Sequence, residues 1–331
     1  MQSTILIMRE RLQEAFDRQQ KRLYDDREVR AIIDLLFEEV CSLSRADRIM
    51  HPEITLPANH RDRLLQIVAQ MQHGVPVQQA LGYEWFCGEK FQVSPDVLIP
   101  RPETAELIEW VKMSQGELSQ YSASAPLRLL DVGTGSGCIG ITLARVINNS
   151  TVLAIDLSTA ALSIALTNSF QQGVDNIQFA QCDILTSVDK FAPKTFSNTL
   201  PTIYQHSLLH LDANHDAHFS TSCQQFEIII SNPPYICRHE AAEMSEIVLD
   251  HEPGVALFVP DDDPLLFYRT IARFGLSHLS AGGMLFFEIN AAYGEATCRL
   301  LDQLGYTDVT LRKDINGRDR MVRATYNSSL R

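Results

Sequence analysis

The sequence predicts an α/β protein in which a mostly parallel sheet, with helices on both faces, follows a helical domain. Over roughly the first 75 residues, apolar side chains recur at helical spacing. From Leu127 onward, short runs typical of buried strands alternate with helical patterns, and this order favours a doubly wound sheet. A chain of 331 residues is also long enough for about two domains.

The composition is that of an ordinary globular protein, and it argues against several classes of partner. Hydrophobic residues make up 45% of the chain and charged residues 21%. The excess of 41 acidic over 28 basic residues argues against tight binding along a nucleic-acid backbone. The seven cysteines include no Cys-x-x-Cys pair, and the first residues resemble neither a signal peptide nor a membrane span. We therefore expect a cytoplasmic protein with no bound metal, no direct nucleic-acid partner and no membrane partner.

The N-terminal segment is predicted to form amphipathic helices. Asp25 or Asp26 is placed to cap the second helix, and a His-Pro pair breaks the chain before the third. Nothing in this segment has catalytic spacing, so it is equally compatible with a bundle that docks a partner or covers a cleft and with a purely structural bundle. The apolar faces consist of Ile5, Met8, Leu12 and Phe16, of Val29, Ile33, Leu36 and Val40, and of Leu64, Val68 and Met71.

A change of period marks the next segment. Two short runs on either side of Gly88 predict a two-stranded hairpin. Pro102, followed closely by acidic residues, is typical of a helix start. Arg101 lies between two prolines in a stiff, extended stretch. It is either a surface charge in a linker or a clamp at a ligand pocket, and the sequence leaves both interpretations open.

A predicted strand, a glycine-rich loop and a predicted helix form the first candidate ligand site. The three glycines allow a tight turn and a close approach to a ligand, beside the free N–H groups of a helix N-terminus. The stretch from Gly135 to Gly140 also satisfies the dinucleotide pattern G-x-G-x-x-G, but the glycine that directly follows the strand does not start that pattern. An acid at the strand end, able to meet a ligand amino group, favours S-adenosylmethionine instead. The set comprises Asp131, Gly133, Thr134, Gly135, Ser136 and Gly137.

Acidic residues also end the next two predicted strands. Asp156 follows the second strand, about 20 residues past the glycines, where an acid can accept both ribose hydroxyls. Asp183 follows the third strand and is placed to take an adenine amino group. Either residue alone is equally compatible with a helix cap or a surface charge. Together with the loop they form an ordered set at successive strand ends, where open α/β sheets bind their ligands.

The fourth predicted strand, Phe226 to Ile230, stops at Asn232-Pro233-Pro234-Tyr235. Two prolines remove two backbone donors and fix two φ angles, so the sheet ladder cannot continue and the bend is stiff. The Asn232 side chain and the Pro233 carbonyl are then acceptors that can converge beside an aromatic ring. This arrangement suits a planar group that carries NH₂. The alternative is an ordinary turn after a strand.

Residues 186–225 resemble an insertion between two strands. Long loops of this kind are uncommon in compact domains and are usually functional or disordered. His206 and His210 have a spacing found among metal ligands, but nothing else in the segment has a metal-ligand spacing. A solvated surface excursion is the favoured interpretation.

These residues together give the chain a resemblance to the release factor glutamine methyltransferases of the PrmC/HemK type, over nearly its whole length. The family's Asn-Pro-Pro-Tyr and adenosylmethionine loop are both present. The stretch from Leu98 to Thr104 is especially specific, because unrelated methyltransferases with Asn-Pro-Pro-Tyr lack it. Further matching stretches are Glu252 to Phe258, Phe267 to Arg269, Gly282 to Ile289 and Lys313 to Arg320.

The resemblance implies a class I S-adenosylmethionine-dependent methyltransferase with a Rossmann-like, seven-stranded sheet. The implied domains are a helical substrate-docking domain at 1–80, a hairpin and linker at 81–112, and a methyltransferase domain at 113–331. The implied reaction is N5-methylation of the glutamine in the Gly-Gly-Gln motif of peptide-chain release factors. Asn232, Pro233 and Tyr235 would be catalytic, and Pro234 would join them in binding substrate. The cofactor would meet the loop and the acids named above, together with Ile184 and Asn232.

The sequence departs from the family pattern at several positions. Ala105 stands where an acid is common, Ile184 replaces a frequent aromatic beside the adenine, and Asn290 and Tyr293 replace a usual Gly and Gln. These changes leave the reaction centre in place and bear on the affinity for the cofactor.

Two rival functions remain compatible with the sequence. An enzyme that methylates the N6 amino group of adenine in DNA or RNA would also use Asn-Pro-Pro-Tyr, with the base flipped out. The net charge of −13 and the lack of a separate basic domain argue against it. A non-catalytic scaffold that keeps the fold is the other rival, and equilibrium binding of S-adenosylmethionine would distinguish it.

Overall fold

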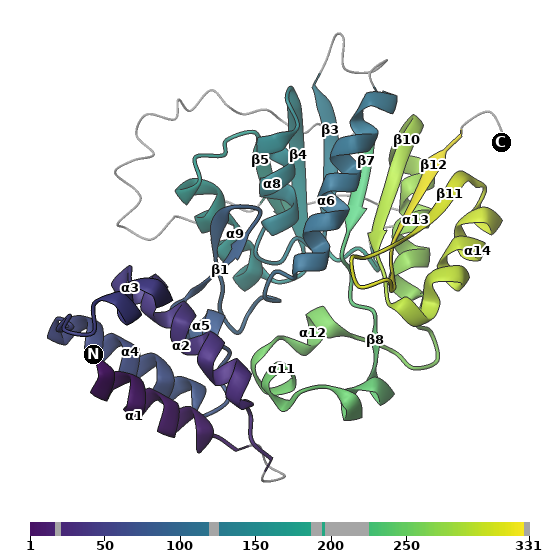
Figure 1. Ribbon diagram of the computed structural model, residues 1–331. Coiled ribbons are helices and arrows are strands. Elements are labelled where there is room, and N and C mark those ends of the chain that lie inside the picture. Colours follow the sequence, from purple (N-terminus) through teal and green to yellow (C-terminus); the bar gives the residue numbers. More distant parts are fainter. Residues whose placement is uncertain (17–20, 119–125, 187–193, 196–224, 328–331) are drawn as a thin grey trace. The chain divides into compact units, whose positions relative to one another are not determined.

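The computed structural model describes residues 1–16, 21–118, 126–186, 194–195 and 225–327 (Figure 1). His206 and His210, and nearly all of the predicted insertion, lie outside these residues. The chain divides into two compact units. One comprises residues 1–84 and 243–252, and the other comprises 85–242 and 253–331. Each unit is described by itself below.

The first unit is a helical bundle. Its core consists of buried side chains from the first, second and fourth helices, with Leu12, Leu36 and Leu64 fully inaccessible to solvent. The predicted helical spacing is therefore confirmed for most of these positions. The helices are α1 (Gln2–Gln13), α2 (Asp26–Cys41), α3 (Arg45–Met50), α4 (Ala58–Met71), α5 (Val77–Leu81) and α11 (Glu246–His251).

The ends of the first two helices differ in how well the sequence predicts them. Asp25 caps α2, because its side chain accepts hydrogen bonds from two backbone amides of the first turn while Glu28 reaches back to the backbone amide of Asp25. The prediction that Phe16 continues the apolar face of α1 is wrong. The helix ends at Gln13, and Phe16 is 46% exposed and forms an isolated bridge with Arg22.

A segment from the second half of the chain completes this bundle. The Ile247 side chain of α11 packs against the helical core. The Nε2 atom of Gln79 donates a hydrogen bond of 2.7 Å to the carbonyl of His251. A Cβ atom at Gly74, whose φ is +82°, would lie 3.3 Å from the His251 ring. The bundle thus holds this segment by a close backbone approach as well as by apolar contact.

The second unit is built on one sheet with the strand order β11-β12-β10-β7-β3-β4-β5-β6. The five central strands, from β10 to β5, are parallel, and β12 and β11 continue the sheet antiparallel. The predicted seven-stranded, mostly parallel sheet is confirmed, and the short β6 adds an antiparallel pair at its edge. The strands are β3 (Leu127–Val132), β4 (Ser150–Asp156), β5 (Ile177–Gln181), β6 (Lys194–Thr195), β7 (Phe226–Ser231), β10 (Leu279–Glu288), β11 (Tyr306–Lys313) and β12 (Asp319–Tyr326).

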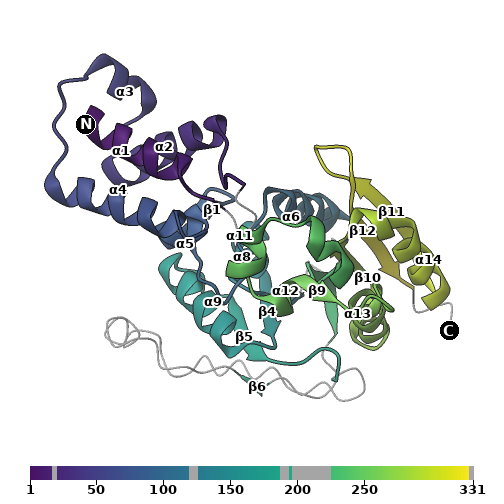
Figure 2. The ribbon, with the colours of Figure 1, turned by 90° about the horizontal axis from the view of Figure 1, so that it is seen from below.

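Alternate side chains of the central strands belong to two separate apolar cores, one on each face of the sheet. Leu129 of β3 joins the core under α6, α8 and α9, whereas its neighbour Leu130 joins the core under α13 and α14. Helices therefore cover both faces of the sheet (Figures 1 and 2). The helices are α6 (Pro102–Ser114), α8 (Cys138–Val146), α9 (Thr159–Gln171), α13 (Leu266–His278) and α14 (Gly294–Leu304).

Shorter elements connect these layers. The predicted hairpin is present as β1 (Tyr83–Phe86) and β2 (Glu89–Gln92), and α6 begins at Pro102 as predicted. The two-residue strands β8 (Ile236–Cys237) and β9 (Phe258–Val259) pair in parallel, with α12 (Gly254–Leu257) just before β9. Short 3-10 helices are η1 (Gln115–Leu118), η3 (Arg238–Glu243) and η4 (Ala291–Tyr293).

The sheet order fixes where a ligand can bind. The chain runs outward from β3 through β4 to β5, and later resumes on the other side of β3 with β7. Adjacent connections therefore leave the sheet in opposite directions between β3 and β7. At such a switch point the carboxyl ends of parallel strands leave a crevice, which is where open α/β sheets bind ligands.

Candidate functional site

A pocket lies at the carboxyl ends of β3, β4, β5 and β7, within the second unit. Apolar side chains and a few polar groups line it, as is usual for small-molecule sites. Most of the predicted site residues are on its wall, whereas Asp131, Gly137 and Tyr235 are not. The predicted residues on the wall are Gly133, Thr134, Gly135, Ser136, Asp156, Asp183, Ile184, Asn232, Pro233 and Pro234.

The glycine loop leaves open space where other residues would place a side chain. Gly133 and Gly135 have φ values of +74° and +56°, which side chains rarely tolerate. Among the described residues, apart from the adjacent ones in the chain, no atom lies within 4 Å of a Cβ built at either position. The next glycine, Gly137, has φ +83° and is the N-cap of α8. The loop therefore presents bare backbone to the pocket just before a helix N-terminus.

Asp131 lies behind this loop, fully buried in β3. Its Oδ2 atom accepts a hydrogen bond of 2.6 Å from the Thr134 hydroxyl and one of 3.0 Å from the Gly140 amide. Its Oδ1 atom is buried and has no hydrogen-bond partner among the described residues. Burial raises the pKa of this carboxyl group to about 7, although both hydrogen bonds lower it. Asp131 thus braces the loop with one oxygen, while the other makes no hydrogen bond to the described residues.

Asp156, at the end of β4, is also tied to the loop. Its Oδ2 atom accepts a hydrogen bond of 2.9 Å from the Gly135 amide, and its Oδ1 atom accepts one of 2.8 Å from Ser158. Burial raises the pKa of Asp156 above its ordinary value. A carboxylate has about four lone-pair sites, so each oxygen can still accept a ligand hydroxyl.

The third strand contributes a polar and an apolar residue. Asp183 uses its Oδ1 atom to accept a hydrogen bond of 2.9 Å from the Leu185 amide. Between them, Ile184 is 7% exposed and lines the pocket with an aliphatic side chain. Contact at this position is therefore aliphatic, without the ring stacking that an aromatic residue would give.

The Asn-Pro-Pro-Tyr turn begins where β7 ends. The Ser231 hydroxyl donates a hydrogen bond of 2.6 Å to the carbonyl of Val132, which ties the end of β7 to the end of β3. The Nδ2 atom of Asn232 donates to the Thr104 hydroxyl at 3.3 Å. The Tyr235 hydroxyl donates to Oε1 of Glu288 at 3.2 Å, and burial raises the pKa of this tyrosine. The turn is therefore held at its start and along its length.

Three residues around this turn were not assigned a definite role from the sequence. Arg101 and Thr104 line the pocket, so the interpretation of Arg101 as part of a pocket is the one that its position supports. Glu288 is 1% exposed and lies at the end of β10. Both Thr104 and Glu288 fall within stretches that resemble the family, and this membership was the one signal in the sequence that could have indicated them.

Asn290 departs from the family pattern and takes part in the local hydrogen bonding. Its Nδ2 atom donates to the carbonyl of Tyr235 at 3.1 Å and to the carboxylate of Glu240. Its Oδ1 atom accepts from the Ala292 amide at 3.0 Å. The side chain therefore supports the turn rather than the cofactor region.

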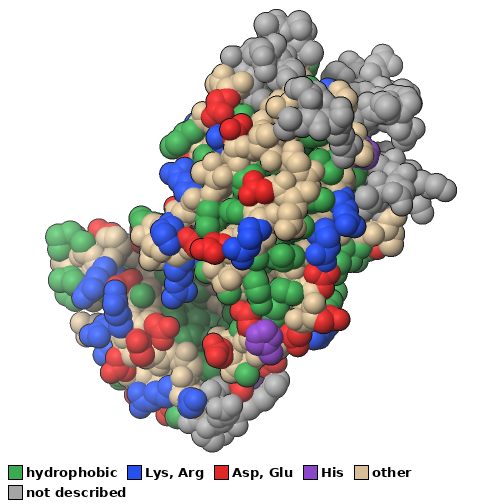
Figure 3. Space-filling model, turned by 90° about the vertical axis from the view of Figure 1, so that its right-hand side faces the viewer, with side chains coloured by type: hydrophobic (Ala, Val, Ile, Leu, Met, Phe, Trp, Pro, Cys, Tyr) green, Lys and Arg blue, Asp and Glu red, His purple; other side chains and the backbone are tan. Residues whose placement is uncertain are grey.

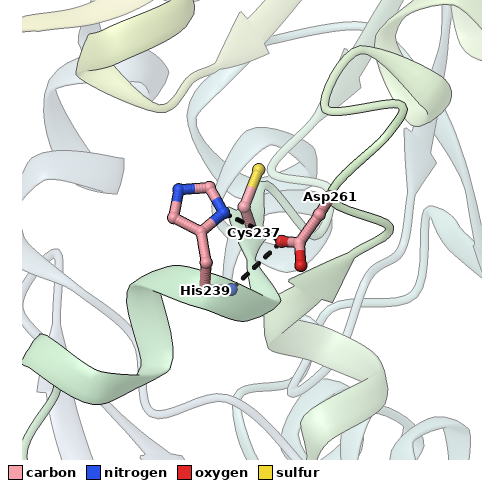
Figure 4. A group of neighbouring side chains, drawn as sticks. All are labelled: Cys237, His239 and Asp261. Atoms are coloured by element: carbon pink, nitrogen blue, oxygen red, sulfur yellow. Dashed lines mark hydrogen bonds and ion pairs between the residues drawn. The ribbon is translucent and has the colours of Figure 1, made fainter.

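A cysteine, a histidine and an aspartate come together just after the turn (Figure 4). Possible ligand atoms of Cys237, His239 and Asp261 all lie within 4.8 Å of one another. The His239 ring and backbone amide both contact Oδ1 of Asp261, at 2.9 and 3.0 Å, and the thiol lies 3.4 Å from the Tyr293 hydroxyl. Because His239 pairs with Asp261 and the Cys237 thiol pairs with Tyr293, we assign these contacts the role of tying β8 to the segment after β9 and to Tyr293.

The surface has no single dominant charge on the face drawn in Figure 3. Lys and Arg side chains are interspersed there with Asp and Glu. None of the helices within the described ranges has the length and apolarity that a bilayer crossing needs.

Comparison with known proteins assigns the chain to a family. A model of PrmC N-terminal domains matches residues 10–82, and a model of methyltransferase domains matches residues 123–246. The release factor glutamine methyltransferase of Flavobacterium psychrophilum is 35% identical over 92% of this chain and 94% of its own length. That of Bacteroides thetaiotaomicron is 37% identical over 91% of this chain and 94% of its own length. The chain therefore belongs to the family of release factor glutamine methyltransferases.

Proposed function

We propose that this protein methylates the side-chain amide nitrogen of the glutamine in the Gly-Gly-Gln motif of peptide-chain release factors, with S-adenosylmethionine as methyl donor. The observation that carries the proposal is the common pocket. The Asn232-Pro233 turn and the glycine loop, separated by about a hundred residues of sequence, line the same cavity. A donor bound at the loop and an amide bound at the turn would therefore be neighbours.

The residues present suit S-adenosylmethionine. The buried Oδ1 atom of Asp131 has no hydrogen-bond partner among the described residues, so we propose that it accepts from a ligand ammonium group. The open space above Gly133 and Gly135 accommodates a ligand close to the backbone. Asp156 would accept the ribose hydroxyls, and Asp183 with Ile184 would meet the adenine. Ser136, Thr134 and Gly137 complete the loop.

When bound, S-adenosylmethionine supplies a methyl group on a positively charged sulfur, which keeps the bonding electrons as the new nitrogen–carbon bond forms. An amide nitrogen is a poor nucleophile because its lone pair is delocalised. The Oδ1 atom of Asn232 and the carbonyl of Pro233 would accept hydrogen bonds from its NH₂ group. These fixed acceptors orient the nitrogen and favour the positive charge that develops on it. The surplus proton leaves for solvent after transfer, so a strong base is not needed.

Tyr235 and Pro234 would shape the substrate side of the turn. The Tyr235 hydroxyl is held by Glu288, which fixes the ring. We propose that this ring packs on the plane of the glutamine amide when substrate binds. Pro234 lines the pocket and gives the turn its rigidity.

The charge of the chain favours a protein substrate over nucleic acid. The net charge is −13, and α1 carries both signs, whereas a strand-binding enzyme needs a continuous basic surface. The helical unit would contribute binding energy away from the reacting amide. Release factors act on ribosomes, so the cytoplasm is the compartment that this activity requires.

The test is parallel incubation of the protein and methyl-labelled cofactor with a bacterial release factor, a short Gly-Gly-Gln peptide and duplex DNA. We expect label on the motif glutamine of the whole factor, located by mass spectrometry. The peptide should be a much poorer substrate, and the DNA should stay unlabelled. Label in DNA but not in the factor would overturn the proposal, and failure to bind cofactor would favour a scaffold.

A further inference from the structure

A buried carboxylate lies behind the Asn-Pro-Pro-Tyr turn and contacts it from two directions. Glu288 is 1% exposed, and its two oxygens have different partners. The Oε2 atom accepts a hydrogen bond of 2.6 Å from the Thr104 hydroxyl, and the Oε1 atom accepts one of 3.2 Å from Tyr235. Thr104 in turn contacts Asn232. One carboxylate thus connects α6, the end of β10 and the turn.

The hydrogen bonds of Thr104 have a fixed direction. A threonine hydroxyl has one hydrogen to donate, and an ionised carboxylate can only accept. The hydrogen therefore points to Glu288, and the hydroxyl oxygen is left as an acceptor for Asn232. Only the NH₂ end of the Asn232 amide can donate to it.

This direction decides which end of Asn232 faces the substrate. The two ends of a side-chain amide have nearly the same shape, so the hydrogen-bond partners determine its orientation. With NH₂ held by Thr104, the Oδ1 atom must point away from Thr104. In the opposite orientation, an NH₂ group would meet the NH₂ group of the glutamine, and no hydrogen bond would form between them.

We propose that Thr104 and Glu288 are positioning residues that fix the acceptor end of Asn232 toward the substrate amide and hold the Tyr235 ring. This inference rests on the proposed function. The new element is that a carboxylate outside the substrate contacts, Glu288, sets the orientation of the Asn232 side-chain amide. The arrangement needs Glu288 to be ionised, because a protonated carboxyl group no longer fixes the direction of the Thr104 hydrogen.

The surroundings of Glu288 determine when it is ionised. Burial raises its pKa, while the Thr104 hydroxyl, Arg320 and the Tyr235 hydroxyl lower it. Protonation at acidic pH would release the Thr104 hydroxyl and with it the preferred orientation of Asn232. The titratable and charged groups that act on Glu288 or respond to its charge are Arg320, Tyr235, Glu103, Tyr268 and Cys138.

The test compares three substitutions with the wild type on a whole release factor. Thr104→Val keeps the shape of the side chain but removes the hydroxyl. We expect kcat to fall roughly 10- to 100-fold, by analogy with residues that orient metal ligands, while the Kd for S-adenosylmethionine stays near that of the wild type. Thr104→Ser restores the hydroxyl and should restore most of kcat. A general loss of structure would not be reversed by this smaller residue.

A matched control makes the same chemical change elsewhere. Thr142 of α8 is 1% exposed, and its hydroxyl has no hydrogen-bond partner among the described residues. Thr142→Val should therefore leave kcat unchanged. If it lowered kcat as much as Thr104→Val does, loss of buried hydroxyl packing would explain both, and the positioning role would be wrong.

The third substitution addresses the charge. Glu288→Gln has the shape of the carboxylate but does not titrate. Its single amide oxygen can accept from the Thr104 hydroxyl or from the Tyr235 hydroxyl, but not from both as Glu288 does, so one of the two contacts is lost. The wild-type kcat should fall on the acidic side of its pH profile as Glu288 is protonated. In Glu288→Gln this acidic limb should disappear and kcat should be low throughout. An acidic limb that persists unchanged in Glu288→Gln would overturn the role of its ionisation.

The wild-type arm separates the two proposals. If the wild type labels no release factor, the proposed function fails. If the wild type labels the factor and Thr104→Val does so with the same kcat, the positioning inference alone fails.

Discussion

The backbone amide of Gly135 donates a hydrogen bond of 2.9 Å to the carboxylate of Asp156. The acid that would hold the ribose therefore also fixes the loop that would lie against the ligand. Asp156→Ala should remove both contributions and weaken S-adenosylmethionine binding by about 1–3 kcal/mol, the range for hydrogen bonds to charged groups. Isothermal titration calorimetry on the purified variant measures this directly.

The control for this variant is Asp175→Ala, which removes an exposed acid outside the pocket lining. Its affinity for the cofactor should equal that of the wild type. Unchanged affinity in a folded Asp156→Ala protein would remove Asp156 from the cofactor site.

Asn232→Ala should lose most of the turnover while keeping the fold. The side chain is half-buried at a strand end and is polar, so it is a member of neither apolar core. Deleting one preorganised polar group costs about 10²–10³-fold in kcat in comparable sites. Single-turnover kinetics with saturating release factor and cofactor give this number.

The exposed Asn316 supplies a control substitution to Ala in a hairpin turn far along the chain. Both variants should unfold at the same denaturant concentration as the wild type within error. Near-normal turnover of Asn232→Ala would mean that another group positions the nucleophile.

Cofactor binding should strengthen as the pH rises toward neutrality. Burial raises the pKa of Asp131 to about 7 in the protein without ligand, so below that pH the carboxyl group is largely protonated. If its Oδ1 atom accepts from the ligand ammonium group, binding must release this proton. The affinity should then rise by up to about tenfold per pH unit below 7 and level off above it. Calorimetry in buffers of different ionisation enthalpy detects the released proton.

The raised pKa of Asp131 also makes the stability of the ligand-free protein depend on pH. Stability should fall as the pH rises, whereas cofactor affinity should increase. Unfolded, Asp131 has its ordinary pKa of 3.8, so between that value and about 7 the native state holds a proton that the unfolded state has lost. The free energy of unfolding should therefore fall as the pH rises through this interval. Asp131→Asn does not titrate, and its urea-unfolding midpoint should depend less on pH. An identical pH dependence in both proteins would contradict the assignment.

Two glycine substitutions should differ in their cost although both positions have positive φ. A Cβ atom at Gly173 (φ +65°) would meet no atom of the described residues within 4 Å beyond its chain neighbours, so Gly173→Ala should cost only the backbone strain, about 1 kcal/mol. A Cβ atom at Gly137 (φ +83°) would lie 2.6 Å from Ile141 and 3.1 Å from the Cβ of Ala165. Gly137→Ala should add a packing cost of about 1–3 kcal/mol. Urea unfolding of the two variants in parallel would show equal losses if this packing were unimportant.

Local patterns were sufficient to predict the positions of the strands and of the acids that follow them. The strands β4 and β5 are short runs rich in apolar residues, so Asp156 and Asp183 could be placed at strand ends without knowledge of the sheet. Parallel strands bring their carboxyl ends to one edge, and the pocket lining confirms that these residues are brought together. The side chain of Asp131 instead lies behind the loop, since it is the penultimate residue of its strand.

The contacts that support the turn could not be predicted in the same way. Thr104 and Glu288 are 184 residues apart, and no spacing rule connects two positions on different elements. Their pairing depends on how α6 packs over β10, which is a property of the whole fold. The prediction of where α1 ends was wrong for a local reason, because the apolar spacing continues to Phe16 although the helix ends at Gln13.

The segment Glu243–Glu252 belongs to the helical unit, although the residues before and after it in the chain belong to the other unit. The chain passes between them three times, at residues 84–85, 242–243 and 252–253. A fragment that starts at Trp85 would therefore carry Ile247 without the apolar core that covers it. For the same reason, the first 84 residues could not be exchanged for another domain by joining two genes end to end. Any replacement would also need a surface that accepts α11, so the two units are expected to be inherited and to diverge as one piece.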